Sequence, residues 1–215
     1  MLVLAIDTSS AAITAAVVRL TPDVAVGAER TTMNSRGHGE YLAPAIVDCL
    51  VEAGAVPKDL AAIVAGTGPG PFTGLRVGLV TAAVMGDVLG IPTYGVCSLD
   101  AIAGDHRGPL LVATDARRKE VYWARYLDGV RVEGPAVSRP ADVRIASGEM
   151  AGAGARLYAG DLGLPFFNQD YPSAAALVGR AADRIRAGAP SELLTPLYLR
   201  RPDAVEPGRP KAVTQ

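Results

Sequence analysis

The chain has 215 residues, 49% of them hydrophobic, and a mean hydropathy of +0.23, which permits a sizeable core and excludes global disorder. The formal net charge of −1 argues against a strongly basic nucleic-acid-binding protein. Residues 1–104 carry five Lys or Arg and nine Asp or Glu, whereas residues 105–215 carry sixteen and thirteen. This asymmetry supports an N-terminal lobe at 1–104 and a smaller C-terminal lobe at 105–199. The Pro- and charge-rich composition of residues 200–215 predicts a flexible tail.

The N-terminus and the cysteines indicate a cellular compartment. Residues 1–7 lack the basic segment and the cleavage site of a signal peptide. Cys49 and Cys97 lie in apolar contexts; they could form a bridge, but buried thiols of a reduced protein are favoured. We therefore expect a cytoplasmic protein.

The first predicted strand, at 2–6, ends in three polar residues. Two further strands, at 12–20 and 24–32, follow and are joined by a proline turn. Asp7, Thr8 and Ser9 could hold a phosphate or a metal-bound nucleotide at this strand end. A polar strand terminus whose Asp caps local N–H groups explains them equally well.

The predicted helix at 40–53 has an unusually narrow polar face. Its polar or helix-unfriendly positions are Glu40, Pro44, Asp48 and Glu52, which form a single stripe four residues apart. Only about a quarter of the circumference is therefore polar, less than on an ordinary surface helix. The helix is either sandwiched within one subunit or carries a partner surface, and we favour the partner surface.

A buried strand at 60–66 runs into a loop at 66–71 in which glycine and proline alternate. A glycine loop before a helix suggests a phosphate site. However, no lysine occurs between Lys58 and Lys119, and two prolines remove backbone donors that a phosphate would need. A structural tight turn is therefore favoured.

The following helix, predicted at 73–90 with Thr73 as its N-cap, is apolar on nearly all sides. It is not expected to span a membrane, because the run without ionisable residues between Arg76 and Asp87 falls short of the roughly 18 residues needed. Small residues recur every fourth position, which lets another backbone approach closely, from within the lobe or across an interface. The candidate interface residues of the two helices are Leu42, Ile46, Val47, Leu50, Gly74, Gly78, Ala82, Val84 and Met85.

The second half of the chain repeats the order of the first. A strand at 109–114 ends at Asp115, and a hairpin follows around the Asp128-Gly129 turn. After Asp115 come three cations, in which Arg117 and Arg118 are a possible contact for an anion such as RNA or an acidic partner. A solvated turn explains this charge run as well and is favoured on charge alone.

The sequence contains no assembled catalytic or metal-binding set. The two histidines, His38 and His106, lie far apart, and neither has a second His or Cys at the spacing of metal ligands. The Gly-x-Ser-x-Gly motif of many serine hydrolases is also missing. We therefore predict no catalytic residues and no metal site.

Seven stretches resemble, in order, the whole length of the TsaB (YeaZ) family of the tRNA threonylcarbamoyladenosine system. They are LAIDTSSAAITAAVV, HGEYLAPAIVDCLVEAG, GTGPGPFTGLRVGLVTAA, GIPTYGVCSLDAIA, DARRKEVYWARY, GAGARLY and PLYLR. Pro71 departs from the family pattern, which usually has Ser there, and this weakens a nucleotide role for the loop. The His-x-x-x-His metal motif of the paralogue TsaD is absent, because Asn34 and Leu42 flank His38 at that spacing.

The resemblance implies a two-lobed α/β fold like that of actin, Hsp70 and the sugar kinases, with mixed sheets flanked by helices and a reduced second lobe. It implies a non-catalytic scaffold that pairs with a TsaD-type catalytic subunit, is joined by a small TsaE-type ATPase, and self-associates when alone. It further implies that the subunit needs no cofactor of its own, since the complex uses ATP and magnesium, and that tRNA is contacted indirectly. An ATP-dependent small-molecule kinase of the same superfold and a metallopeptidase-like protein are the alternatives.

Overall fold

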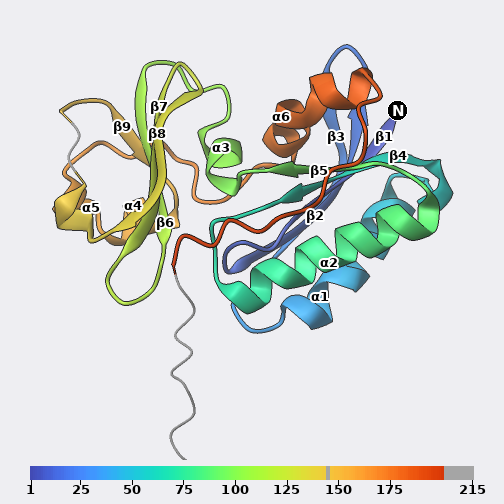
Figure 1. Cartoon of the computed structure of the whole chain (residues 1–215), viewed down its shortest axis with the longest axis horizontal. Coiled ribbons are helices and arrows are strands. Elements are labelled where there is room, and N and C mark those ends of the chain that lie inside the picture. The colour runs from blue at the N-terminus through green and yellow to red at the C-terminus, as the bar shows by residue number, and fades with distance from the viewer. Residues whose placement is uncertain (144–145, 201–215) are drawn as a thin grey trace, which may run out of the picture.

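The computed structural model describes residues 1–143 and 146–200 (Figure 1). The described strands are β1 (Leu2–Asp7), β2 (Ala12–Leu20), β3 (Val24–Met33), β4 (Leu60–Gly66), β5 (Thr93–Val96), β6 (Pro109–Asp115), β7 (Val121–Leu127), β8 (Val130–Ser138) and β9 (Glu149–Ala151). The described helices are α1 (His38–Glu52), α2 (Phe72–Leu89), α3 (Ser98–Ala103), α4 (Ala153–Leu157), α5 (Ala159–Leu162) and α6 (Ala174–Arg186), with single 3-10 turns at Pro57–Asp59 and Pro140–Asp142. Most of the tail predicted at 200–215 lies outside the described residues.

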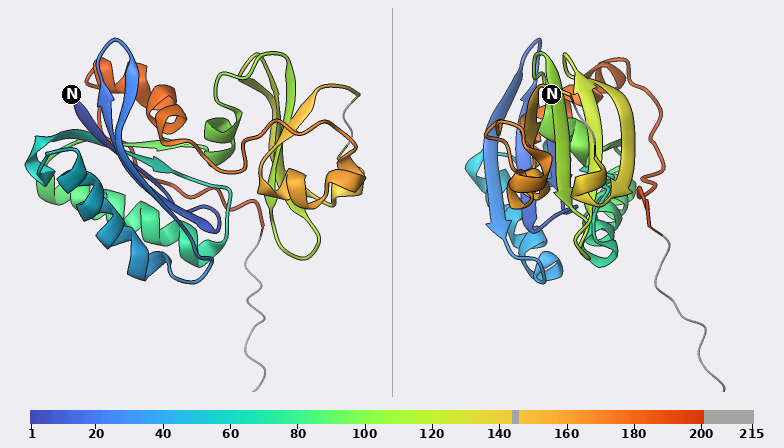
Figure 2. Two further views of the ribbon diagram at one scale, coloured as in Figure 1. Left: turned by 180° about the vertical axis from the view of Figure 1, so that it is seen from behind. Right: turned by 90° about the vertical axis from the view of Figure 1, so that its left-hand side faces the viewer.

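The first sheet has the strand order β3-β2-β1-β4-β5. β1, β2 and β3 are antiparallel neighbours, whereas β4 and β5 run parallel to β1. Figures 1 and 2 show α1 and α2 on one face of this sheet and α6 on the other. Alternate residues of β1 therefore enter two cores: Leu4 packs toward α1 and α2, while Val3 packs toward α6. This is why β1 has a continuous apolar sequence.

The second sheet, in the order β8-β7-β6-β9, repeats the topology of the first. β6, β7 and β8 form an antiparallel meander, and β9 runs parallel to β6. α3 covers the face toward the first sheet, and α4 packs on the opposite face. The predicted α/β fold of two mixed sheets flanked by helices is confirmed. The repeated order of a strand that ends in Asp, followed by a hairpin, is observed at Asp7 and Asp115.

The chain returns to the first sheet after the second is complete. α6 packs on the first sheet, so the physical second lobe does not include all of residues 105–199, which differs from our prediction. The reason lies in the sequence of α6, whose buried side chains, among them Leu177 and Val178, cover the face of the first sheet that α1 and α2 leave open. A helix that closes a sheet need not follow that sheet directly in sequence.

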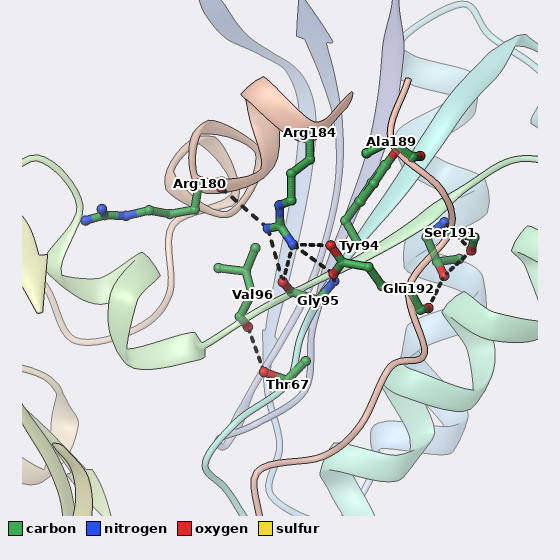
Figure 3. Close-up of polar contacts among 10 residues, drawn as sticks. Thr67, Tyr94, Gly95, Val96, Arg180, Arg184, Ala189, Ser191 and Glu192 are labelled. Atoms are coloured by element: carbon green, nitrogen blue, oxygen red, sulfur yellow. Dashed lines mark hydrogen bonds and ion pairs between the residues drawn. The ribbon is translucent and has the colours of Figure 1, made fainter. Parts of the chain in front are cut away.

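The segment after α6 seals the edge strand β5 (Figure 3). The Glu192 carboxylate forms two bonds with the Arg184 guanidinium, of 2.6 and 2.8 Å, and accepts the Gly95 N–H at 3.0 Å. Arg184 also donates to the Gly95 carbonyl, and the Thr93 N–H donates to the Ser191 hydroxyl. The backbone groups of an edge strand, which would otherwise be open to another chain, are thereby occupied.

The ends of α2 differ slightly from the prediction. The helix begins at Phe72 after Pro71, which is its N-cap, and no side chain caps it, so Thr73 is not the N-cap. Its C-cap is Gly90 with φ of 66°, a conformation that glycine adopts without strain. By length and composition α2 is the one helix in the described ranges that could cross a membrane, yet its glycine-rich face packs on the first sheet as in a core helix.

Candidate functional sites: the glycine loop, the helical face and the inter-lobe turn

The glycine loop closes over the carboxylate of Asp7. Asp7 Oδ1 accepts hydrogen bonds from the Ser9 N–H at 2.9 Å and the Ser9 hydroxyl at 2.7 Å. Its Oδ2 accepts the Ser98 hydroxyl at 2.6 Å, and Ser98 in turn accepts the Gly68 N–H at 3.1 Å. The strand end, the loop and the start of α3 are thus held together by one buried carboxylate.

Close backbone approach explains two glycines of this loop. A Cβ on Gly66 would lie 1.8 Å from Asp7 Oδ2, and a Cβ on Gly70 would lie 2.0 Å from the Ser9 carbonyl oxygen. The loop is therefore pressed against the residues that a phosphate would have to reach. These contacts support the structural explanation for Asp7, Thr8 and Ser9, and a nucleotide role for them stays a prediction without support from this geometry.

Asp7 and His38 are two ionisable side chains that bind the β1–β2 turn. Burial raises the pKa of the Asp7 carboxyl, and the hydrogen bonds from Ser98 and Ser9 and the charge of His38 partly offset this effect. His38 Nε2 lies 2.8 Å from the Ser10 carbonyl oxygen, so this nitrogen carries a proton and donates it. His38 therefore serves to close the β1–β2 turn against α1.

The stripe of small residues on α2 faces inward. A Cβ added to Gly74 would lie 2.9 Å from His38 Nε2, and one on Gly78 would lie 2.3 Å from Thr8 Oγ1. The Gly78 N–H donates to that hydroxyl at 3.1 Å, and Gly86 faces the Thr93 methyl in the same way. The predicted close approach is present: Thr8 after β1, Thr93 at the start of β5 and His38 at the start of α1 make it.

This packing corrects most of the predicted interface. The residues that the core of the protomer covers, so that a partner cannot reach them, are Leu42, Ile46, Leu50, Gly74, Gly78 and Ala82. Met85 is half-buried against the same core. The prediction took the apolar stripes of both helices together, whereas the sheet buries one side of each helix and leaves the other side open.

An apolar face nevertheless remains open on α1 and α2. Val47 and Val84, both predicted to lie at an interface, are among five valines of these helices that are between 55% and 77% exposed. The other three are Val51, Val80 and Val88. The two helices pack side by side on the same face of the sheet, so their open sides form one surface, which we call the valine face.

The predicted anionic contact lies at the mouth of a cleft between the lobes. Arg117 lines a cavity of about 370 Å³ together with Phe72, Tyr122 and Tyr198, and it lies 3.7 Å from the Asp115 carboxylate. Arg118 follows it on the same exposed turn. The sequence therefore located an exposed cationic turn correctly, and the structure adds the aromatic side chains that border it.

Comparisons with known proteins agree with this architecture. The model of the tRNA N6-adenosine threonylcarbamoyltransferase family TsaD matches residues 31–203. A Mycobacterium tuberculosis protein is 52% identical over 202 residues, which cover 94% of this chain and 93% of the relative. The Bacillus subtilis tRNA threonylcarbamoyladenosine biosynthesis protein TsaB is 36% identical over 129 residues, 59% of this chain and 55% of that protein. YeaZ of Pseudomonas aeruginosa superposes with a TM-score of 0.76 at 26% identity, covering 92% of this chain and 99% of that one.

The chain belongs to the TsaB (YeaZ) family. In this TsaB-family protein Pro71, the residue that departs from the family pattern, is the N-cap of α2 and lines the inter-lobe cleft. Sequence reasoning missed Ser98, whose hydroxyl joins Asp7 to the glycine loop, and the role of His38. A polar residue two positions after the short strand β5 was the available signal for Ser98. Within residues 1–143 and 146–200, no group of three or more His, Cys, Asp or Glu is close enough to hold a metal ion.

Proposed function

We propose that the protein acts in tRNA threonylcarbamoyladenosine biosynthesis as a non-catalytic subunit that docks a TsaD-type catalytic partner through the valine face. Membership of the TsaB family supports the pathway, because relatives in Bacillus subtilis and Escherichia coli carry that biosynthetic name. The observation that carries the docking role is the valine face itself, an uncovered apolar surface on two adjacent helices.

The apolar area of the valine face limits the free energy that it can contribute to association. Completing the burial of a half-exposed valine is worth about 1 kcal/mol, so the five valines supply roughly 5 kcal/mol. Association costs of about 4–15 kcal/mol oppose this gain. The face can therefore orient a partner and supply the centre of an interface, while contacts outside the valines must add the remaining affinity.

The Asp7 site makes the kinase alternative the weaker one. A kinase of this superfold would need room for phosphates at the glycine loop, and here the loop packs against Ser9 and Asp7. We therefore infer no cofactor of its own for this subunit, with ATP and magnesium used elsewhere in the complex. A TsaE-type ATPase as third component, self-association in isolation and a cytoplasmic location complete the proposal. Equilibrium dialysis with ATP and Mg²⁺ tests the cofactor statement directly.

Glutamate substitutions on the valine face test the docking role. Val47→Glu and Val84→Glu should leave the circular dichroism spectrum unchanged, because both side chains are already exposed. They should abolish binding to the TsaD-type partner, because the new carboxylate would have to be desolvated without a counter-charge. Val132→Glu, an equally exposed valine on β8 of the other lobe, is the matched control.

The outcomes separate the possible occupants of the face. Loss of partner binding with Val47→Glu and Val84→Glu but not with Val132→Glu supports the proposal. If the two variants lose only self-association in sedimentation and still bind the TsaD-type partner with wild-type affinity, the face is a homodimer surface and the docking role is refuted.

A further inference from the structure

The turn between β6 and β7 has an unusual backbone. Arg117, Arg118 and Lys119 all have left-handed conformations, with φ of 62°, 56° and 61°. Residues other than glycine enter this region rarely and then singly, because their Cβ crowds the following carbonyl. The flanking carboxylate residues hold the turn: the Arg117 N–H donates to Asp115 Oδ1 at 2.9 Å, and the Glu120 N–H donates to the Arg117 carbonyl at 3.0 Å.

Three cationic side chains therefore stand at positions where glycine or asparagine would be less strained. All three residues are exposed, so the core gives no reason for their long side chains. Backbone strain of this kind concentrates at functional sites, where the surrounding structure maintains it. The strain points to a ligand that uses positive charge at this turn.

An exposed aromatic pair lies across the same cleft. The rings of Phe72 and Tyr198 stack with centroids 5.2 Å apart and an interplanar angle of 26°. The Arg76 guanidinium lies 3.9 Å from the Phe72 ring centroid, and its Nε donates to the Tyr198 hydroxyl at 2.8 Å. Phe72 is 49% exposed and Tyr198 39% exposed, although neither belongs to the valine face.

The cleft brings the cations and the aromatic pair together. Phe72, Arg117, Tyr198 and Arg200 line one cavity of about 370 Å³ that is bordered by both lobes. In Figure 1 the described C-terminal segment passes between the lobes beside the start of α2. Tyr198 and Arg200 of this segment line the cavity together with Phe72, the first residue of α2. The cationic side chains at or beside this cleft are Arg76, Arg117, Arg118, Lys119 and Arg200, against the carboxylates of Asp115 and Glu120. The region is thus positive in a chain whose net charge is −1.

We propose that this inter-lobe cleft and its rim bind single-stranded RNA directly. An unpaired base stacks on the exposed ring of Phe72 or Tyr198, and the neighbouring phosphates contact the cationic turn at Arg117 and Lys119. An acidic protein segment would be attracted by the cations alone and would leave the stacked rings without a role. The inference rests on the proposed function. It goes further, because the family resemblance implies only indirect contact of this subunit with tRNA.

Fluorescence anisotropy of a fluorescein-labelled RNA stem–loop against the full chain tests the inference. The double variant Arg117→Gln/Lys119→Gln should weaken binding and reduce the slope of log affinity against log salt by about 1.4, since each single-strand phosphate contact contributes about 0.7. Phe72→Ala should lower the affinity about 5- to 100-fold at fixed salt without changing the slope, because it removes stacking and no charge. Tyr198→Ala provides a second test of the stacking.

The control for charge is Arg19→Gln/Lys58→Gln, which removes two exposed cations at the opposite end of the first sheet. Stem–loop binding that is lost in the cleft variants and kept in this control supports the inference. Equal loss in both double variants, or binding to a blunt RNA duplex as tight as to the stem–loop, would refute it. Competition by poly-glutamate as effective as by RNA, with Phe72→Ala unaffected, would assign the surface to an acidic protein partner instead.

Binding of each variant to the TsaD-type partner, measured in parallel, keeps the two proposals separate. If the RNA does not bind while the wild-type chain still binds its partner through the valine face, the RNA inference fails and the proposed function stands. If RNA binds as expected while the partner does not, the proposed docking role fails by itself.

Discussion

The substitution Gly78→Ala tests whether the stripe of small residues on α2 packs against the core of the protein or faces a partner. In an exposed helix interior this substitution stabilises a protein by about 1 kcal/mol, because alanine is the better helix former. At Gly78 the new methyl would lie 2.3 Å from Thr8 Oγ1, 3.2 Å from Thr8 Cγ2 and 3.3 Å from Ile6 Cγ2. The first contact is too close for any real Cβ, so either α2 or the end of β1 must move.

The expected magnitude follows from three contributions. Forcing a methyl into a packed site costs about 1–3 kcal/mol. Moving the helix away from Thr8 also lengthens the 3.1 Å hydrogen bond from the Gly78 N–H, which is worth about 1 kcal/mol. Together these losses exceed the gain of about 1 kcal/mol in helix propensity, so we expect a net destabilisation of about 1–3 kcal/mol.

Gly179→Ala is the matched control. Gly179 lies in the middle of α6, is exposed, and has no atom within 4 Å of the position its Cβ would take. Here the same substitution should raise the free energy of unfolding by about 1 kcal/mol. A change of that size shifts the Tm of a chain of this length by about 2–4 °C, so thermal unfolding followed by circular dichroism should move the two variants in opposite directions.

Removing the obstructing side chain provides the decisive measurement. In the background of Thr8→Ala, both atoms of Thr8 nearest to the new methyl are absent, and Gly78→Ala should become much less destabilising. If Gly78→Ala instead raises the Tm of the wild-type protein as Gly179→Ala does, and weakens only partner binding, the stripe is an external surface and the packing described here is wrong.

Two further predictions concern buried ionisable groups. Burial raises the pKa of Asp7 above its ordinary value of 3.8. Between that value and the folded-state pKa, the unfolded chain has already lost the proton that the folded chain still holds. The free energy of unfolding therefore falls as pH rises through this interval. The stability of Asp7→Asn relative to wild type should therefore increase over this interval in urea unfolding at stepped pH, and a flat difference would contradict the assignment. Burial also raises the pKa of Cys97 to about 11 and raises that of Cys49. Neither thiol of the native protein should react rapidly with DTNB at about pH 8, whereas both should react in urea; a rapid reaction of the folded chain would show that one thiol is accessible.

Patterns that repeat within one element were enough to predict most of the architecture. The continuous apolar run of β4 predicts burial on both faces, and the structure places Ile63 in the core under α1 and α2 and Val64 in the core under α6. The Asp128-Gly129 turn fixed the β7–β8 hairpin, since only a two-residue turn with positive φ joins these strands. The return of α6 to the first sheet was not predictable, because its amphipathic pattern does not state which sheet it covers.

The sequence also could not predict whether the stripe of small residues on α2 faces the core or a partner. Gly74 and Gly78 show that something approaches α2 closely, but a strand end, a neighbouring helix and a partner helix all require the same small residues. Once the stripe is assigned to the core, geometry fixes the rest. Residues on the opposite side of α2, such as Val80 and Val84, must then be exposed. The predicted interface therefore included the buried sides of both helices, and of its residues only Val47 and Val84 are exposed enough to stay candidates.

The two aspartates that end β1 and β6 explain why we place ligand binding at the inter-lobe cleft and not at the glycine loop. Asp7 and Asp115 occupy equivalent positions in the two meanders, yet Asp7 is buried beneath the glycine loop while Asp115 is half-exposed at the inter-lobe cleft. The loop that follows β4 packs down on Asp7, and the hydroxyls of Ser9 and Ser98 satisfy it. The first lobe is thereby closed at the place where the fold could hold a ligand. In the second lobe, Asp115 instead braces the strained turn that presents Arg117 to the cleft. One copy of the motif stabilises the fold, and the other supports an exposed cationic turn, so ligand contact is expected at the second copy.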